Sequence, residues 1–102
     1  MIKHIVMWDV RGETVEARQE AAQFVKHRFD TLAGLIPGMS CLEIGLDMSG
    51  VDYACHVVLY SEFDSLEALD AYASHPEHLK IRQELGDIRI SRHQVDYISK
   101  AV

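Results

Sequence analysis

The stretch that decides the fold is residues 2–36, which read IKHIVMWDVRGETVEARQEAAQFVKHRFDTLAGLI. Its beginning alternates between two faces and predicts a strand over residues 2–10, with apolar side chains on both faces. Thr14 is a typical helix N-cap. From there to about Ile36 the apolar residues recur at steps of three and four, which predicts one long amphipathic helix. The members of this apolar stripe are Val15, Ala22, Val25, Phe29, Leu32 and Ile36.

The rest of the chain continues the alternation of strands and helices. Period-two patterns predict strands over residues 39–47 and 52–60. The segment Asp64-Ser65-Leu66-Glu67 resembles a capping box and predicts the start of a second helix. Pro76 ends that helix and is a favourable first residue for a short further helix. A last strand is expected over about residues 88–98.

The resulting order is βαββαβ within a single domain, residues 1–102. This order is typical of the α+β ferredoxin-like sandwich, four antiparallel strands with helices on one face. The other face should then be polar. Two strands nevertheless carry apolar residues on the face that we assign to the outside: Val6, Trp8, Val10, Val58 and Tyr60. No element remains to cover them, so we expect a homodimer in which a second sheet encloses a pocket, a dimeric α/β barrel.

Composition excludes some classes of function. The net charge is −6, from 10 basic and 16 acidic residues, without a basic cluster. We therefore expect neither nucleic acid nor an anionic membrane as a partner. No apolar run approaches membrane-spanning length, and we expect a cytoplasmic protein. The spacing of histidines and cysteines predicts no metal site, and no cofactor-binding motif is present.

Two of the six histidines are expected on strand faces that point into the enclosed interface. They are His4 and His56, each flanked by apolar residues on the same face. Asp96, on the last strand, could orient one of these imidazoles and raise its basicity. Two interpretations stay open: a satisfied polar network of the core, or part of a functional site.

A second group of polar side chains surrounds the break between the two later helices, Tyr72-Ala73-Ser74-His75-Pro76-Glu77-His78. A tyrosine can donate a proton and a neutral histidine can accept one. We assign His75 to helix capping. We assign His78 to the pocket, because it shares a face with Ile81 and Leu85.

These residues resemble the stress-responsive dimeric α/β-barrel (Dabb) domain family, over essentially the whole chain. The matching pieces are Lys3-His4-Ile5-Val6, Ile36-Pro37-Gly38-Met39, His56-Val57-Val58 and Tyr72…His75-Pro76-Glu77-His78. Family members are dimers in which two four-stranded sheets form a barrel. They include the plant olivetolic acid cyclase, which closes a linear polyketide by aldol condensation without a cofactor.

The resemblance implies roles for particular side chains. Tyr72 and His78 match an acid–base pair, and His4, His56 and Asp96 match residues that support it. The stretches Lys80-Ile81-Arg82-Gln83-Glu84-Leu85 and Arg92-His93-Gln94 depart from the cyclase, because a wall this polar does not suit a long alkyl tail.

Three hypotheses of function follow. The first is cofactor-free acid–base chemistry on a carbonyl compound, of the cyclase, isomerase or lyase type. The second is a non-catalytic stress-response or small-molecule-binding dimer, and the third is a monooxygenase-like or haem-degrading protein, by analogy of fold alone. The expected ligand-binding side chains are Val6, Trp8, Phe24, Val58 and Ile81. The volume left open among these side chains distinguishes the first two hypotheses, because an interior filled by side chains would leave no room for a substrate.

Overall fold

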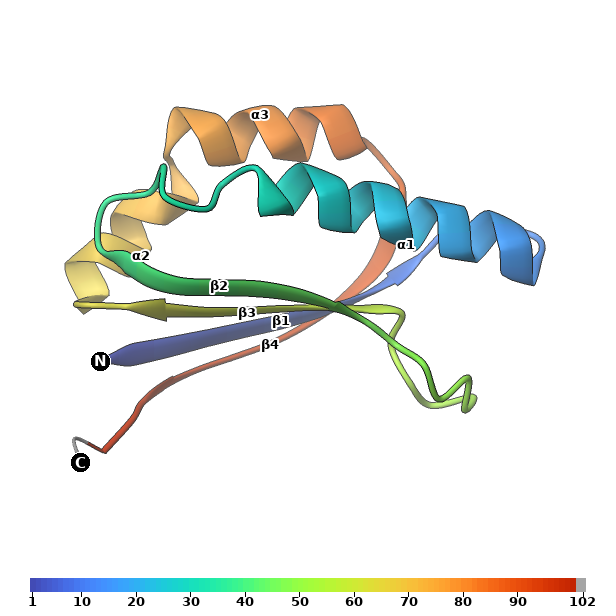
Figure 1. The fold of residues 1–102 in the computed structure, drawn as a ribbon, viewed down its shortest axis with the longest axis horizontal. Coiled ribbons are helices and arrows are strands. Elements are labelled where there is room, and N and C mark those ends of the chain that lie inside the picture. Colours follow the sequence, from blue (N-terminus) through green and yellow to red (C-terminus); the bar gives the residue numbers. More distant parts are fainter. Residues whose placement is uncertain (101–102) are drawn as a thin grey trace.

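A computed structural model describes residues 1–100 as one four-stranded antiparallel sheet with three helices on one of its faces (Figure 1). The elements follow one another as β1 (Ile2–Val10), α1 (Val15–Asp30), β2 (Met39–Leu46), β3 (Val57–Phe63), α2 (Leu66–Ala73), α3 (Pro76–Leu85) and β4 (Arg89–Ile98). The strand order is β2-β3-β1-β4, so β2 and β4 are the edges. The prediction of an α+β ferredoxin-like fold is confirmed.

The helix starts lie within one residue of the predicted positions, since α2 is capped by Ser65 and not by Asp64, the first residue of the predicted capping box. Thr14 caps α1 by accepting a hydrogen bond from the Ala17 N–H at 3.0 Å, and Ser65 caps α2 through Ala68. His75 caps α3, because its Nδ1 accepts a hydrogen bond from the Glu77 N–H at 3.1 Å. The assignment of His75 to capping is therefore correct.

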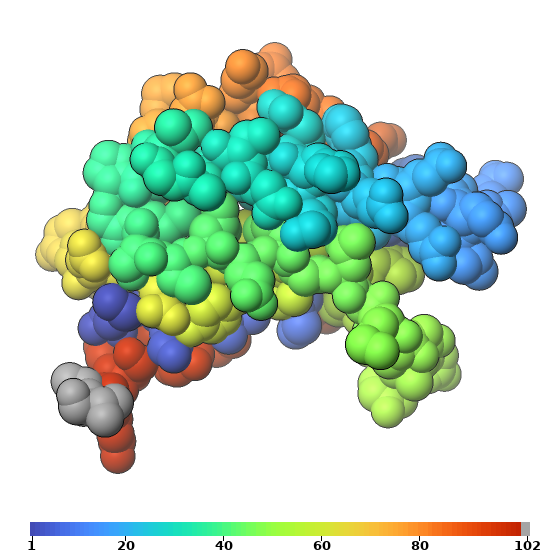
Figure 2. Space-filling model, in the orientation of Figure 1, coloured from blue at the N-terminus to red at the C-terminus, as the bar shows by residue number. Residues whose placement is uncertain are grey.

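Two element boundaries differ from the predictions. α1 ends at Asp30 rather than near Ile36, and the segment after it forms turns that include Gly34 at a φ of +77°. The buried stripe continues through these turns, which explains why the pattern resembles a longer helix. β3 begins at Val57 rather than at residue 52, because residues 47–56 form a loop that projects beyond the sheet (Figure 2).

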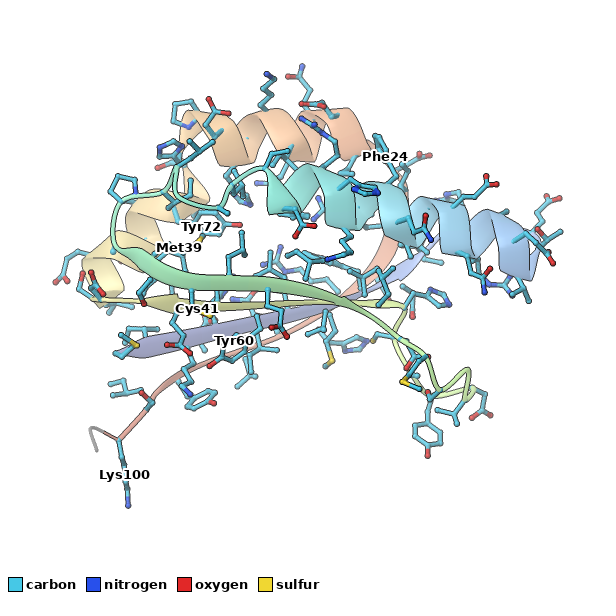
Figure 3. The ribbon with its side chains drawn as sticks, in the orientation of Figure 1. Phe24, Met39, Cys41, Tyr60, Tyr72 and Lys100 are labelled. Carbon is cyan, nitrogen blue, oxygen red and sulfur yellow. The ribbon has the colours of Figure 1, made fainter. Side chains whose placement is uncertain are left out.

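The faces of β1 and β3 are also assigned differently by the structure. β1 pairs with β3 so that Val6 lies opposite Leu59 and Trp8 opposite Val57. These four side chains and Val10 are buried beneath the helices, where they form one core with Phe29 of α1. The placement of Val6, Trp8 and Val10 on an outer face was therefore wrong, whereas Val58 and Tyr60 do lie on the face away from the helices. Figure 3 shows Tyr60 and Tyr72 on opposite sides of the sheet.

The face of the sheet without helices still carries apolar side chains, which we call the open face. Its central members are Ile5, Met7, Val58, Tyr60, Val95 and Tyr97, paired across β3, β1 and β4. Met7, Val95 and Tyr97 are each more than a third exposed. These apolar side chains are neighbours on adjacent strands and form one continuous patch, which is typical of a protein–protein interface.

Candidate active site

A cavity of about 260 Å³ lies between the sheet and the helices of one chain. It is lined by His4, Val6, Trp8, Phe29, Leu59, Leu66, Leu69, Asp70, Tyr72, Ala73, His78, Arg89, Arg92, Gln94 and Asp96. This cavity lies on the helix side of the sheet and not on the face where the sequence analysis expected a second sheet. Trp8 and Phe29 stack at 5.1 Å between ring centroids at one end of the cavity.

Tyr72 and His78 come together across the break between α2 and α3. Tyr72 lies near the end of α2 and is almost completely buried, and His78 lies in the first turn of α3. Their ring centroids are 4.3 Å apart. His78 Nδ1 lies 3.2 Å from the carbonyl oxygen of Ala73, so we assign the Nδ1 proton to this hydrogen bond. Nε2 is then left with its lone pair as a proton acceptor.

The environment pushes the pKa values of these two groups in opposite directions. Burial raises the pKa of the Tyr72 phenol to about 12, although the charges of Arg92 and Arg89 oppose the shift. Burial lowers the pKa of His78, against the effect of its hydrogen bond to Ala73. At neutral pH the pair is therefore a protonated phenol beside a neutral imidazole.

His4 and Asp96 form a second pair at the other end of the cavity. They lie opposite each other in the β1–β4 register, and His4 Nδ1 donates to Asp96 Oδ1 at 2.5 Å. Gln94 Nε2 donates to the second carboxylate oxygen at 2.9 Å. The His4 ring lies 6.2 Å from the Tyr72 ring. The sequence-based pairing of Asp96 with a buried imidazole thus has its counterpart in the structure, with His4 as the partner.

His56 lies elsewhere, contrary to the expectation that it accompanies His4. It precedes β3, and its Nδ1 accepts a hydrogen bond from the Val10 N–H at 2.9 Å. Asp9 Oδ1 is 3.7 Å from the same nitrogen. His56 does not line the cavity. Its geometry indicates a structural role in holding the end of β1 against the loop.

Of the five expected ligand-binding residues, only Val6 and Trp8 line the cavity. Phe24 is exposed on α1 (Figure 3). Val58 lies on the open face, and Ile81 is buried outside the cavity wall. Sequence reasoning found Tyr72 but missed Arg89, Phe29 and the other lining residues of α2, which are Leu66, Leu69, Asp70 and Ala73. Alternation along the last strand places Arg92 and Gln94 on the same face as Asp96, so the sequence pattern could have predicted that they line the cavity.

Residues 1–100 contain no group of three or more histidine, cysteine or acidic side chains that could hold a metal ion. Within the same described range, none of the helices has the length and apolar character needed to cross a membrane.

Comparison with known proteins identifies the family. The sequence matches the stress-responsive A/B barrel domain over residues 2–99. The chain belongs to the Dabb family. The resemblance that the sequence analysis described is therefore confirmed. No curated protein matches the chain.

Several solved structures are similar to this chain over almost its whole length. A dimeric protein of unknown function with a ferredoxin-like fold from Bacteroides fragilis is 34% identical, with 94% of this chain and 93% of the other covered and a TM-score of 0.81. A hydroxynitrile lyase from Passiflora edulis is 16% identical, with coverage of 99% and 94% and a TM-score of 0.78. A candidate antibiotic biosynthesis monooxygenase from Nitrosomonas europaea is 22% identical, with coverage of 97% and 98% and a TM-score of 0.68. The last two likenesses concern the fold alone.

Proposed function

We propose that this Dabb protein carries out cofactor-free acid–base chemistry on a small carbonyl compound. The observation that carries the proposal is the pairing of a protonated, buried Tyr72 with a neutral His78 at the wall of an accessible cavity. Pairs of titratable groups whose environments separate their pKa values are typical of acid–base sites. A hydroxynitrile lyase among proteins of the same fold is compatible with chemistry of this class.

In the proposed reaction His78 Nε2 removes a proton from the carbon next to the carbonyl group. The electron pair of the broken C–H bond moves into the carbonyl, and the Tyr72 hydroxyl donates its hydrogen bond to the oxygen on which negative charge develops. The product of this step is an enol or enolate. Return of a proton from His78 to carbon closes the cycle. His4, held by Asp96, supports the far end of the cavity, and Asp96 acts as a positioning residue through His4.

The test is hydrogen–deuterium exchange at carbon, followed by NMR in D₂O with a panel of small aldehydes and ketones. We expect the protein to accelerate exchange for at least one compound. Tyr72→Phe and His78→Gln should each reduce the rate at least about 100-fold, because each removes an acid–base group. His27→Gln, on the exposed side of α1, is the matched control and should leave the rate unchanged. Unchanged rates in the Tyr72 and His78 variants would contradict the proposal and favour the non-catalytic binding hypothesis.

We also propose that the protein is a homodimer that pairs through its open face. Similar structures are described as dimeric, and the open face presents apolar side chains that no element of the described chain covers. A charge at the centre of this face would have to be desolvated on pairing. Met7→Asp should therefore give a monomer in light scattering, whereas Leu79→Asp, on the helix side, should not. A dimeric Met7→Asp variant would contradict this interface.

A further inference from the structure

The cavity contains a positively charged side chain for which the described residues provide no counter-ion. The guanidinium of Arg89 lies 5.0 Å from the centroid of the Trp8 ring and 5.6 Å from that of Phe29. Among residues 1–100, no hydrogen bond or ion pair of the Arg89 side chain is found. Burial, followed by the charges of Arg92 and Arg82, lowers the pKa of Arg89, against an opposing effect of Tyr72.

A second arginine lines the same end of the cavity. Arg92 lies opposite Trp8 in the β1–β4 register, and its guanidinium donates two hydrogen bonds to Gln94 Oε1. Two acidic residues also line the cavity, but neither is within 4.0 Å of an arginine nitrogen in the described chain. Asp96 is already bonded to His4 and Gln94, and Asp70 is an exposed residue of α2. The guanidinium of Arg89 and the Nη1 group of Arg92 are therefore available to an external anion.

We propose that the cavity selects carbonyl compounds that carry a carboxylate group, with Arg89 and Arg92 as the carboxylate-binding residues. This inference rests on the proposed function, since it names the substrate class of the same site. An arginine presents its N–H groups in a planar fork that matches a carboxylate with two parallel hydrogen bonds. Cation–π contacts with Trp8 and Phe29 hold the guanidinium of Arg89 in the cavity without using its N–H groups as hydrogen-bond donors.

The dimensions of the cavity restrict the ligand further. Its volume of about 260 Å³ lies below the range of roughly 300–1,000 Å³ that is typical of drug-sized ligands. Tyr72 and His78 lie between the His4–Asp96 pair and the arginine end. A short keto acid can place its carboxylate on the arginines while its carbonyl group faces Tyr72. The polar stretch Arg92-His93-Gln94, which departs from the alkyl-lined wall of the cyclase, also favours a charged ligand over an apolar one.

The protein contains a natural reporter for this test, because Trp8 is its single tryptophan and lines the cavity. In ¹H–¹⁵N spectra its indole N–H gives one resolved signal. We propose titrations with benzoylformate, with its uncharged methyl ester, and with inorganic phosphate. Benzoylformate should bind at least about 10-fold more tightly than the ester, because hydrogen bonds to charged groups are stronger. Phosphate should not compete at equal concentration.

Variants assign the preference to the arginines. Arg89→Gln and Arg92→Gln should each weaken benzoylformate binding about 10-fold and leave the ester unaffected. Arg89→Lys, which keeps the charge but loses the fork, should also weaken it. Lys80→Gln removes the same charge from the exposed surface of α3 and should change nothing. Any of four results would overturn the inference. Benzoylformate and its ester could bind equally tightly, or millimolar benzoylformate could leave the Trp8 signal unshifted. Phosphate could bind as tightly as benzoylformate, or the folded arginine variants could bind benzoylformate as the wild type does.

The outcome is separable from that of the proposed function. Benzoylformate has no hydrogen on the carbon next to its ketone, so it reports binding without enolisation. Carboxylate-selective binding without carbon exchange for any keto acid would refute the acid–base chemistry and preserve the ligand class. Carbon exchange that is equally fast for keto acids and neutral ketones would refute the carboxylate ligand class and preserve the acid–base chemistry.

Discussion

Gly38, in the turn before β2, lies close to Ala68 of α2, the helix that carries Tyr72. Gly38 has a φ of +79°, and a Cβ atom added to it would lie 2.5 Å from the Ala68 Cβ. Gly34 has nearly the same backbone conformation, with a φ of +77°, but a Cβ atom added there meets nothing within 4 Å. The pair Gly38→Ala and Gly34→Ala therefore separates backbone strain from steric displacement of α2.

The expected magnitudes differ between the two variants. A left-handed conformation costs a non-glycine residue about 1–2 kcal/mol, and this is the whole effect expected for Gly34→Ala. Forcing an extra carbon into a packed contact costs about 1–3 kcal/mol more. Gly38→Ala should therefore lower the free energy of unfolding by about 2–5 kcal/mol. The carbon-exchange rate should fall as well, because the shift of α2 moves Tyr72 relative to His78.

Urea unfolding, followed by the fluorescence of the buried Trp8, measures these changes. All variants need the same protein concentration, because dimer formation couples stability to concentration. Equal losses of stability in Gly34→Ala and Gly38→Ala would refute the argument, since they would show that the Ala68 contact adds nothing. A normal exchange rate in a destabilised Gly38→Ala variant would refute the link to Tyr72.

Three further perturbations test the site. Asp96→Ala leaves the buried His4 without its hydrogen-bond partner and should cost about 1–3 kcal/mol in urea unfolding, whereas Asp70→Ala, on the exposed wall, should cost little. Ser65→Ala and Thr14→Ala each remove a helix cap and should each cost about 1 kcal/mol; only Ser65→Ala should also slow carbon exchange, because α2 carries Tyr72. The exchange rate should be constant from neutral pH upward until Tyr72 ionises near its pKa of about 12, and should fall in acid only below 6.5, the ordinary pKa of histidine. Folding lowers the pKa of His78, so the contribution of neutral His78 to the free energy of unfolding is complete above pH 6.5. This contribution is lost as the pH falls through the lowered pKa. His78→Gln should remove this part of the loss of stability in acid.

The sequence by itself determined the order of the elements and where the helices begin. Thr14 and Ser65 supply caps through local hydrogen bonds, and Pro76 can start a helix but not continue one. These signals act over three or four residues, so they need no tertiary contact to be read. The family resemblance depended on such local pieces, above all on Tyr72…His75-Pro76-Glu77-His78, and for that reason it was already visible in the sequence.

Only the tertiary structure decided which side of the sheet holds the site. β1 is apolar on both faces, and a period-two pattern does not distinguish the inner face when both would suit burial. Pairing of β1 with β3 and packing against Phe29 turned Val6 and Trp8 toward the helices. The contact between His4 and Asp96 joins residues 92 positions apart. The position of Arg89 over the Trp8 ring depends on the same pairing of β1 with β4. The sequence contained these residues, but their convergence on one cavity required the sheet to form.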